Sequence, residues 1–195
     1  MKTQPKRYEN IFKIIDEIKP KLILEVGTWN GEHAIEMIKY AAKHQPNGVR
    51  GIYYLGFDLF QDITDKQIEL ENSKKVKADY LQVKAKLDKV GCKFNLIMGN
   101  TRETLKNHPT ISVDFIFMDG GHSLLTIDSD WKNTRRFCNR NTVTLLDDYY
   151  PTDITKGCKA LVDHLPLKSY NLDFLEPIDE FENNFKVQMV KVTSK

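Results

Sequence analysis

Cysteine is scarce in this sequence, and its thiols are too widely spaced to form a recognised motif. Cys92, Cys138 and Cys158 include no C-x-x-C pair, which leaves zinc-ribbon and dithiol redox chemistry without support. The odd count and the wide spacing favour three reduced and mostly buried thiols in a cytoplasmic protein.

Long apolar runs and an excess of one charge are missing as well. No stretch approaches the roughly 20 apolar residues of a membrane-spanning helix, and residues 1–8 lack the apolar segment of a secretory signal. The 29 Lys+Arg nearly balance the 27 Asp+Glu, for a formal net charge of +2. Domains that bind duplex nucleic acid usually carry a basic face, so neither a membrane nor duplex nucleic acid is an expected partner.

The chain is long enough for one globular domain over residues 1–195. Its hydrophobic share of 41% is that of an ordinary protein with a sizeable core. Within the first 21 residues, Tyr8, Ile11, Ile15 and Ile18 recur at helical spacing before Pro20 stops the pattern. We expect residues 1–21 to form a helical extension of that domain.

Apolar strand patterns alternate with amphipathic helix patterns through the rest of the chain. The strands are expected at 22–27, 53–59, 94–99, 113–118 and 142–146, and the helices at 31–42, 76–90, 124–137 and 158–165. Residues 170–181 and 185–192 are two extended segments around a short turn, which predicts an antiparallel hairpin. The pattern predicts an α/β fold with a mostly parallel, seven-stranded sheet, helices on both faces and a C-terminal hairpin.

The first strand ends in a glycine turn where such sheets bind ligands, outside the carboxyl ends of the strands. Gly27 permits a sharp turn, and Gly31 starts a helix whose free N–H groups favour an anionic group. A dinucleotide site would show G-x-G-x-x-G, but Trp29 stands in the middle position, which argues against NAD. Asp58 ends the second strand and can accept hydrogen bonds from both hydroxyls of a ribose. The alternative is a tight turn and a solvated acid without any ligand.

Three acids close the fourth and fifth strands. Asp119, Asp147 and Asp148 would repel one another unless one is protonated or a cation lies between them. Carboxylate oxygens suit Mg²⁺, Mn²⁺ or Ca²⁺. The alternative is that Asp119 positions a cofactor while the acid pair meets only water. His122 lies three residues after Asp119, and its imidazole titrates near neutrality, as a general base requires.

Two motifs resemble those of known methyltransferases. Residues 25–31 read E-V-G-T-W-N-G and resemble the E-x-G-x-[aromatic]-x-G motif of class I methyltransferases, in particular the catechol and caffeoyl-CoA O-methyltransferases. Residues 113–122 and 146–149 resemble the D-x-x-F-I-D-G-x-H motif and the later acid pair of mostly bacterial O-methyltransferases, several of which act on sugars. The resemblance runs from about Leu22 to Val192 and implies a Rossmann-like methyltransferase fold.

The resemblance also implies a cofactor site for S-adenosylmethionine. It places Glu25, Gly27, Thr28, Gly31 and His33 around the methionine end, Asp58 at the ribose, and Asn100 and Thr101 near the adenine. It further implies Mg²⁺ bound by Asp119, Asp147 and Asp148, with His122 as the catalytic base beside Asp119. Two positions depart from the relatives, since His33 replaces a usual Ser and Asp148 a usual Asn.

The expected function is therefore S-adenosylmethionine-dependent O-methylation of a small hydroxylated acceptor, either a sugar or a secondary metabolite. The alternatives are a non-catalytic cofactor-binding protein, a nucleotide-dependent oxidoreductase, and methylation of nucleic acid or protein. The balanced charge and the lack of an Asn/Asp-Pro-Pro-Tyr motif count against DNA amino-methylation. Assembly into a homo-oligomer stays open.

Overall fold

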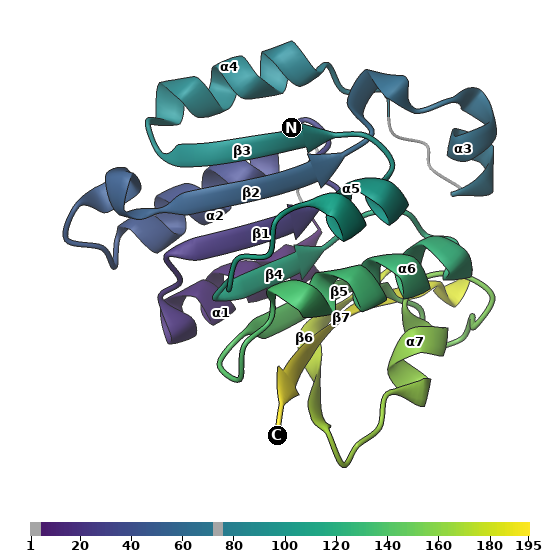
Figure 1. The fold of residues 1–195 in the computed structure, drawn as a ribbon. Helices are drawn as coiled ribbons and strands as arrows, with labels where there is room; N and C mark the ends of the chain where they lie inside the picture. The colour runs from purple at the N-terminus through teal and green to yellow at the C-terminus, as the bar shows by residue number, and fades with distance from the viewer. Residues whose placement is uncertain (1–4, 72–75) are drawn as a thin grey trace.

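A computed structural model describes residues 5–71 and 76–195 as a central sheet between two layers of helices (Figure 1). Residues 1–4 of the predicted N-terminal extension, and residues 72–75, lie outside the described residues. The strands are β1 (Leu22–Val26), β2 (Tyr53–Asp58), β3 (Lys93–Met98), β4 (Phe115–Met118), β5 (Val143–Tyr149), β6 (Tyr170–Glu180) and β7 (Lys186–Ser194). The α-helices are α1 (Glu9–Ile18), α2 (Glu32–Ala42), α3 (Asp65–Leu70), α4 (Tyr80–Val90), α5 (Thr101–Asn107), α6 (Leu124–Thr134) and α7 (Lys159–His164). Short 3₁₀ turns are η1 (Lys6–Tyr8), η2 (Gly48–Gly51), η3 (Phe60–Asp62), η4 (Arg135–Phe137) and η5 (Glu182–Asn184).

The strand order is β3-β2-β1-β4-β5-β7-β6. The first five of these strands are parallel, whereas β7 runs antiparallel between β5 and β6. This confirms the predicted mostly parallel seven-stranded sheet with a C-terminal antiparallel hairpin. The chain turns outward in opposite directions from β1 and β4, so a ligand crevice is expected at the carboxyl ends of these two strands.

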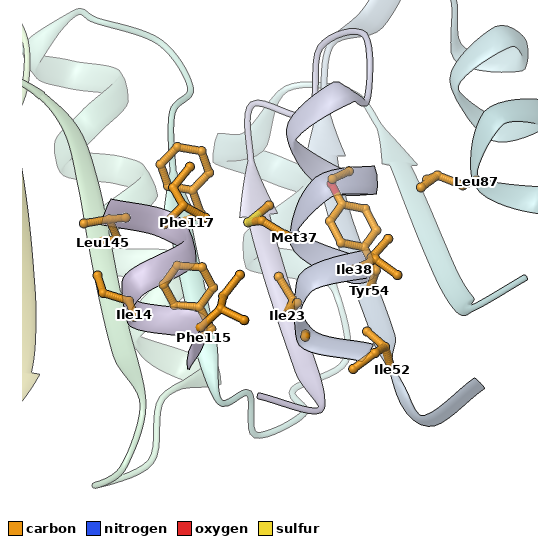
Figure 2. Close-up of a cluster of buried hydrophobic side chains, with 14 of the residues drawn as sticks. Ile14, Ile23, Met37, Ile38, Ile52, Tyr54, Leu87, Phe115, Phe117 and Leu145 are labelled. Atoms are coloured by element: carbon orange, nitrogen blue, oxygen red, sulfur yellow. The ribbon is translucent and has the colours of Figure 1, made fainter. Parts of the chain in front are cut away.

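Alternate residues of the central strands supply two separate hydrophobic layers. Ile23, Phe115 and Phe117 pack beneath α1 and α2, as Figure 2 shows, in a cluster that also receives Leu87 from α4. Leu24 and Ile116, one position along, face α5, α6 and α7 instead. A strand side chain points to alternate faces of its sheet, so these nearly continuous apolar strands are those of a sheet covered on both sides.

Four elements differ from the predicted pattern. The helix predicted from residue 76 begins at Tyr80, because the Asp79 side chain accepts a hydrogen bond from the Gln82 backbone and caps the helix there. Helices α3 and α5 are absent from the sequence-based prediction. Each buries little, since α5 has only Leu105 fully buried and α3 has no buried residue. Strand β5 extends three residues beyond its predicted end, through both acids to Tyr149.

No helix within residues 5–71 and 76–195 combines the length and apolar character needed to cross a membrane. The three cysteines are free thiols, and Cys158 is buried.

Candidate functional site

A cavity of about 280 Å³ opens at the carboxyl ends of β1 to β4. Five of the predicted cofactor residues line it: Gly27, Asp58, Asn100, Thr101 and Asp119. Apolar and aromatic side chains, among them Phe57 and Phe60, form much of the remaining wall. An apolar cleft with a few converging polar groups is the usual form of a small-molecule site.

The turn after β1 is closed by contacts that only glycine permits. Gly27 has a φ of 94°, and a side chain there would overlap the backbone carbonyl of Asp119. Its amide donates to the Phe57 carbonyl at 2.9 Å, and the Asp119 amide donates to the Val26 carbonyl at 2.9 Å. The ends of β1, β2 and β4 are thereby drawn together, which leaves bare backbone exposed to a ligand at this point.

Asp58 is held in place by the backbone of two neighbouring turns. Its Oδ2 accepts a hydrogen bond from the Trp29 amide at 2.8 Å, and its Oδ1 accepts one from the Phe60 amide at 2.6 Å. A carboxylate oxygen can accept more than one hydrogen bond, so these contacts orient the acid and are compatible with ribose hydroxyls as further donors.

The other predicted cofactor residues lie behind the cavity wall. Glu25 and Thr28 both hydrogen-bond the Tyr54 hydroxyl inside the sheet, where Glu25 is fully buried. Gly31 has a φ of 76° and packs closely against Val83 of α4. These residues support the turn from beneath, because their side chains or backbone are already engaged in the core.

His33 lies between the turn and the predicted acid cluster. Its ring packs on Tyr8 with the centroids 4.3 Å apart, and its Nδ1 is 3.9 Å from the Asp119 carboxylate. Burial, together with the charges of Asp119 and Asp147, raises the pKa of Tyr8 well above that of a free phenol. Tyr8 therefore stays neutral and gives the acid cluster an aromatic cover.

Asp119, His122 and Asp148 converge at the carboxyl ends of β4 and β5. One ligand atom from each lies within 4.8 Å of the others, and His122 Nε2 is 2.8 Å from Asp148 Oδ2. Burial acts to raise the pKa of Asp148, but the hydrogen bond and charge of His122, the charge of Arg7 and a hydrogen bond from Tyr150 together outweigh it and hold this pKa below its usual value. Asp148 is therefore ionised and orients the imidazole.

A bulge in β5 and the following loop position this pair. Asp148 has a φ of 60°, and the β5–β7 register shifts between Leu146 and Tyr149. The Gly157 amide donates to the His122 carbonyl at 2.8 Å, and the adjacent Cys158 amide donates to the Asp148 carbonyl at 3.0 Å. Left-handed backbone at a non-glycine residue is strained, and such strain is often found at functional sites.

Asp147 lies outside this cluster, contrary to the predicted set of three acids. Arg7 binds it in a two-pronged contact, with Nε to Oδ1 at 2.7 Å and Nη2 to Oδ2 at 3.0 Å. The same guanidinium donates to Asp179 of β6 at 2.9 Å. Both oxygens of Asp147 accept from Arg7, and the group of ligand atoms that the structure brings together is that of Asp119, His122 and Asp148. Metal binding by Asp147 stays a prediction.

The group of possible metal ligands that the structure brings together contains two carboxylates and an imidazole. Imidazole suits Zn²⁺, Fe²⁺ or Ni²⁺ better than Mg²⁺ or Ca²⁺, which prefer oxygen. An imidazole that binds a metal cannot also take a proton from an acceptor. A metal bound by His122 and a His122 base are therefore alternatives at one position, and the grouped side chains are not the three acids that the resemblance implies for Mg²⁺.

The chain matches one family of known proteins. Residues 24–149 match the family described as a methyltransferase domain, which spans β1 to β5 and all the acids above except Asp179. The chain belongs to this methyltransferase family. None of the curated protein sequences compared with the chain matches it.

Solved structures share the methyltransferase fold over nearly the whole chain. One is the O-methyltransferase TomG from Streptomyces achromogenes, in complex with SAM, with 13% identity, a TM-score of 0.63, and coverage of 96% of this chain and 79% of TomG. The O-methyltransferase from Bacillus cereus, in complex with SAH, has 12% identity, a TM-score of 0.60, and coverage of 98% and 82%. An rRNA methylase from Streptococcus thermophilus has 11% identity, a TM-score of 0.64, and coverage of 100% and 98%. At such low identity, the likeness establishes the fold alone.

Two residues of this candidate site were missed by the sequence analysis. Arg7 could not be found, because nothing local links it to an acid 140 positions away. Asp130 did leave a signal: it lies three residues after Ile127 and one before Trp131, on the apolar face of α6, where an acid is unusual.

Proposed function

We propose that this chain is an S-adenosylmethionine-dependent O-methyltransferase that acts on a small hydroxylated acceptor. The observation that carries the proposal is the His122–Asp148 pair, 2.8 Å apart, beside Asp119 at one end of the cofactor cavity. An imidazole oriented by a buried carboxylate is a common device for taking a proton from a hydroxyl group.

The cofactor, when bound, would supply an electrophilic methyl group on a sulfonium. Asp58 would hold the ribose, and the turn around Gly27 would bring bare backbone to the ligand. If His122 Nε2–H donates to Asp148, the neutral ring carries its lone pair on Nδ1, which would accept the acceptor's hydroxyl proton. Asp148 would stabilise the positive ring that results, while the aromatic side chain of Tyr8 would help to exclude water.

A hydroxyl acceptor of small size agrees with the balanced charge of the chain and with the fold shared with O-methyltransferases. The fold shared with an rRNA methylase makes RNA the second acceptor to test. The direct experiment is a methyl-transfer screen over catechols, sugars, nucleotide-sugars and ribosomal RNA. Transfer to a hydroxyl of a small molecule is expected. Cofactor binding without transfer to any acceptor would indicate a non-catalytic binding protein.

Asp58→Ala is expected to weaken S-adenosylhomocysteine binding by about 1–3 kcal/mol, because the ribose hydroxyls lose their acceptor. Asp58→Asn keeps one carbonyl oxygen and should lose less. Asp62→Ala, an exposed acid four residues on, is the matched control. Calorimetric titration gives the three affinities. Wild-type affinity in both Asp58 variants would remove this residue from the site.

Chelation of divalent metal is expected to leave turnover unchanged, because Arg7 already compensates Asp147 and His122 serves as the base. The measurement is the initial rate with a confirmed acceptor, with and without EDTA. Loss of activity in EDTA that a divalent cation restores would instead indicate a metal at the Asp119–His122–Asp148 group.

A further inference from the structure

A carboxyl group joins the wall of the cofactor cavity to the start of α6. Glu71 directly follows α3 and lines the cavity. Its Oε2 accepts a hydrogen bond from the Ser123 amide at 2.7 Å. Its Oε1 accepts from the hydroxyls of Ser123, at 3.0 Å, and Thr126, at 2.7 Å. Glu71 and Ser123 are 52 positions apart, so these contacts connect two distant segments of the chain.

Helix α3 has little packing of its own to hold it in this wall. None of its residues, all of which the structure describes, is buried, and Leu70 is 54% exposed. Gln67 and Leu70 nevertheless line the cavity beside Glu71. Hydrogen bonds to a carboxylate are stronger than those between neutral groups, so the contacts of Glu71 fix the end of α3 against α6.

The bond to the Ser123 amide also fixes the peptide group of His122. This amide and the His122 carbonyl belong to the same planar peptide unit. The carbonyl accepts from the Gly157 amide at 2.8 Å, so Glu71 holds one end of the unit and the loop after β5 holds the other. A planar unit held at both ends has a fixed orientation, which limits the directions in which the His122 side chain can point.

The glycine before His122 leaves room for this contact. A Cβ at Gly121 would lie 2.6 Å from Oε2 of Glu71, closer than a side chain tolerates. Any larger residue at this position would displace the carboxyl group from the Ser123 amide.

We infer that Glu71 is a positioning residue for the proposed base, because it ties the wall of the cofactor cavity to the peptide group of His122. The inference rests on the proposed function, in which His122 takes the proton of the acceptor. Glu71 acts through Ser123 and takes no part in the proton transfer itself. A small displacement of a catalytic group slows a reaction strongly, so the role of Glu71 is expected to show in kcat.

A purely structural role is the alternative. Ser123 caps α6 by accepting from the Thr126 amide at 3.3 Å, and an acid near the start of a helix is stabilising. On this alternative, Glu71 only stabilises the first turn of α6. The two explanations differ at Gly157, which contacts His122 but lies outside α6.

Hydrogen exchange followed by NMR separates the two explanations without any acceptor. Glu71→Ala is expected to speed exchange of the Ser123 amide about 10- to 100-fold, the usual effect of losing a hydrogen bond to a charged group. Exchange of the Gly157 amide should become faster as well, because the peptide unit is then held at one end only. Glu69→Ala, an exposed acid on α3, is the matched control and should exchange as the wild type does. Unchanged exchange at Gly157 in Glu71→Ala would overturn the inference.

The effect of Glu71 on turnover should depend on His122. With an acceptor found by the methyl-transfer screen, Glu71→Ala is expected to lower kcat about 10- to 100-fold, the loss that a misplaced catalytic group causes. In a His122→Ala background the same substitution should change kcat by less than roughly threefold. Glu71→Gln can accept from the Ser123 amide and donate to the two hydroxyls, so it should restore most of the rate.

Equal slowing by Glu71→Ala in both backgrounds would overturn the inference in favour of the structural role. An active wild-type enzyme with unchanged exchange at Gly157 in Glu71→Ala would overturn this inference alone. Absence of methyl transfer by the wild type to every acceptor would overturn the proposed function, and this inference with it.

Discussion

The His122→Ala variant is expected to transfer methyl groups about 10²- to 10⁴-fold more slowly than the wild type, the usual contribution of a positioned acid–base group. The cause is loss of the group that takes the hydroxyl proton as the methyl moves. Affinity for S-adenosylhomocysteine should change little, because His122 is not among the residues that line the cofactor cavity. The measurement is kcat with a confirmed acceptor, beside the calorimetric affinity.

Raising the pH should partly rescue His122→Ala, since the acceptor hydroxyl then ionises without help. His164→Ala, which removes an exposed imidazole on α7, should behave as the wild type. Because His122 and Asp148 would act as a unit, adding Asp148→Asn to His122→Ala should slow the reaction little further. A His122→Ala enzyme with normal kcat would exclude the base.

Arg7→Met is expected to lower the free energy of unfolding by about 3–5 kcal/mol, the usual cost of removing one partner from a buried ion pair. The Arg7 side chain is 7% exposed and compensates Asp147, whose side chain is fully buried, as well as Asp179. Methionine keeps much of the length of the side chain but leaves both acids without their cation. Denaturant unfolding monitored by circular dichroism gives the value.

Two further variants separate charge from packing. Arg50→Met removes an exposed arginine and should change the stability by no more than about 0.5 kcal/mol. Arg7→Met combined with Asp147→Asn should recover part of the loss, because one uncompensated buried charge is gone. A single Arg7→Met variant as stable as the wild type would show that this ion pair contributes nothing net to folding.

The contacts of Arg7 contribute both to the stability of the fold and to the arrangement of the candidate site. Its contacts join the first described turn of the chain to β5 and to β6, the strand at the sheet edge. The next residue, Tyr8, then packs on His33 and faces the acid cluster. Loss of Arg7 should therefore loosen the packing of Tyr8 on His33 as well as destabilise the fold.

Sequence patterns alone predicted the order of the strands along the chain and four polar residues of the cavity wall, Asp58, Asn100, Thr101 and Asp119. Strand and helix periodicities are local properties, and ligands bind at the carboxyl ends of parallel strands, so Gly27, Asp58 and Asp119 could be assigned to one edge before any contact was known. The late hairpin was also predictable, because two extended segments with a three-residue turn leave no room for a helix.

The partners of the acids depend on contacts between segments that are far apart in the sequence. Asp147 and Asp148 are adjacent in sequence, yet Asp147 makes the two-pronged contact with Arg7, whereas Asp148 pairs with His122 at 2.8 Å and lies 3.9 Å from Arg7. The short helix α5 escaped prediction because a single buried leucine makes no periodic pattern. The ion pair between Arg7 and Asp147 forms only when the completed fold brings these distant segments together. Local sequence patterns therefore indicated where the site lies, whereas contacts between distant segments determine which charged partner each acid has.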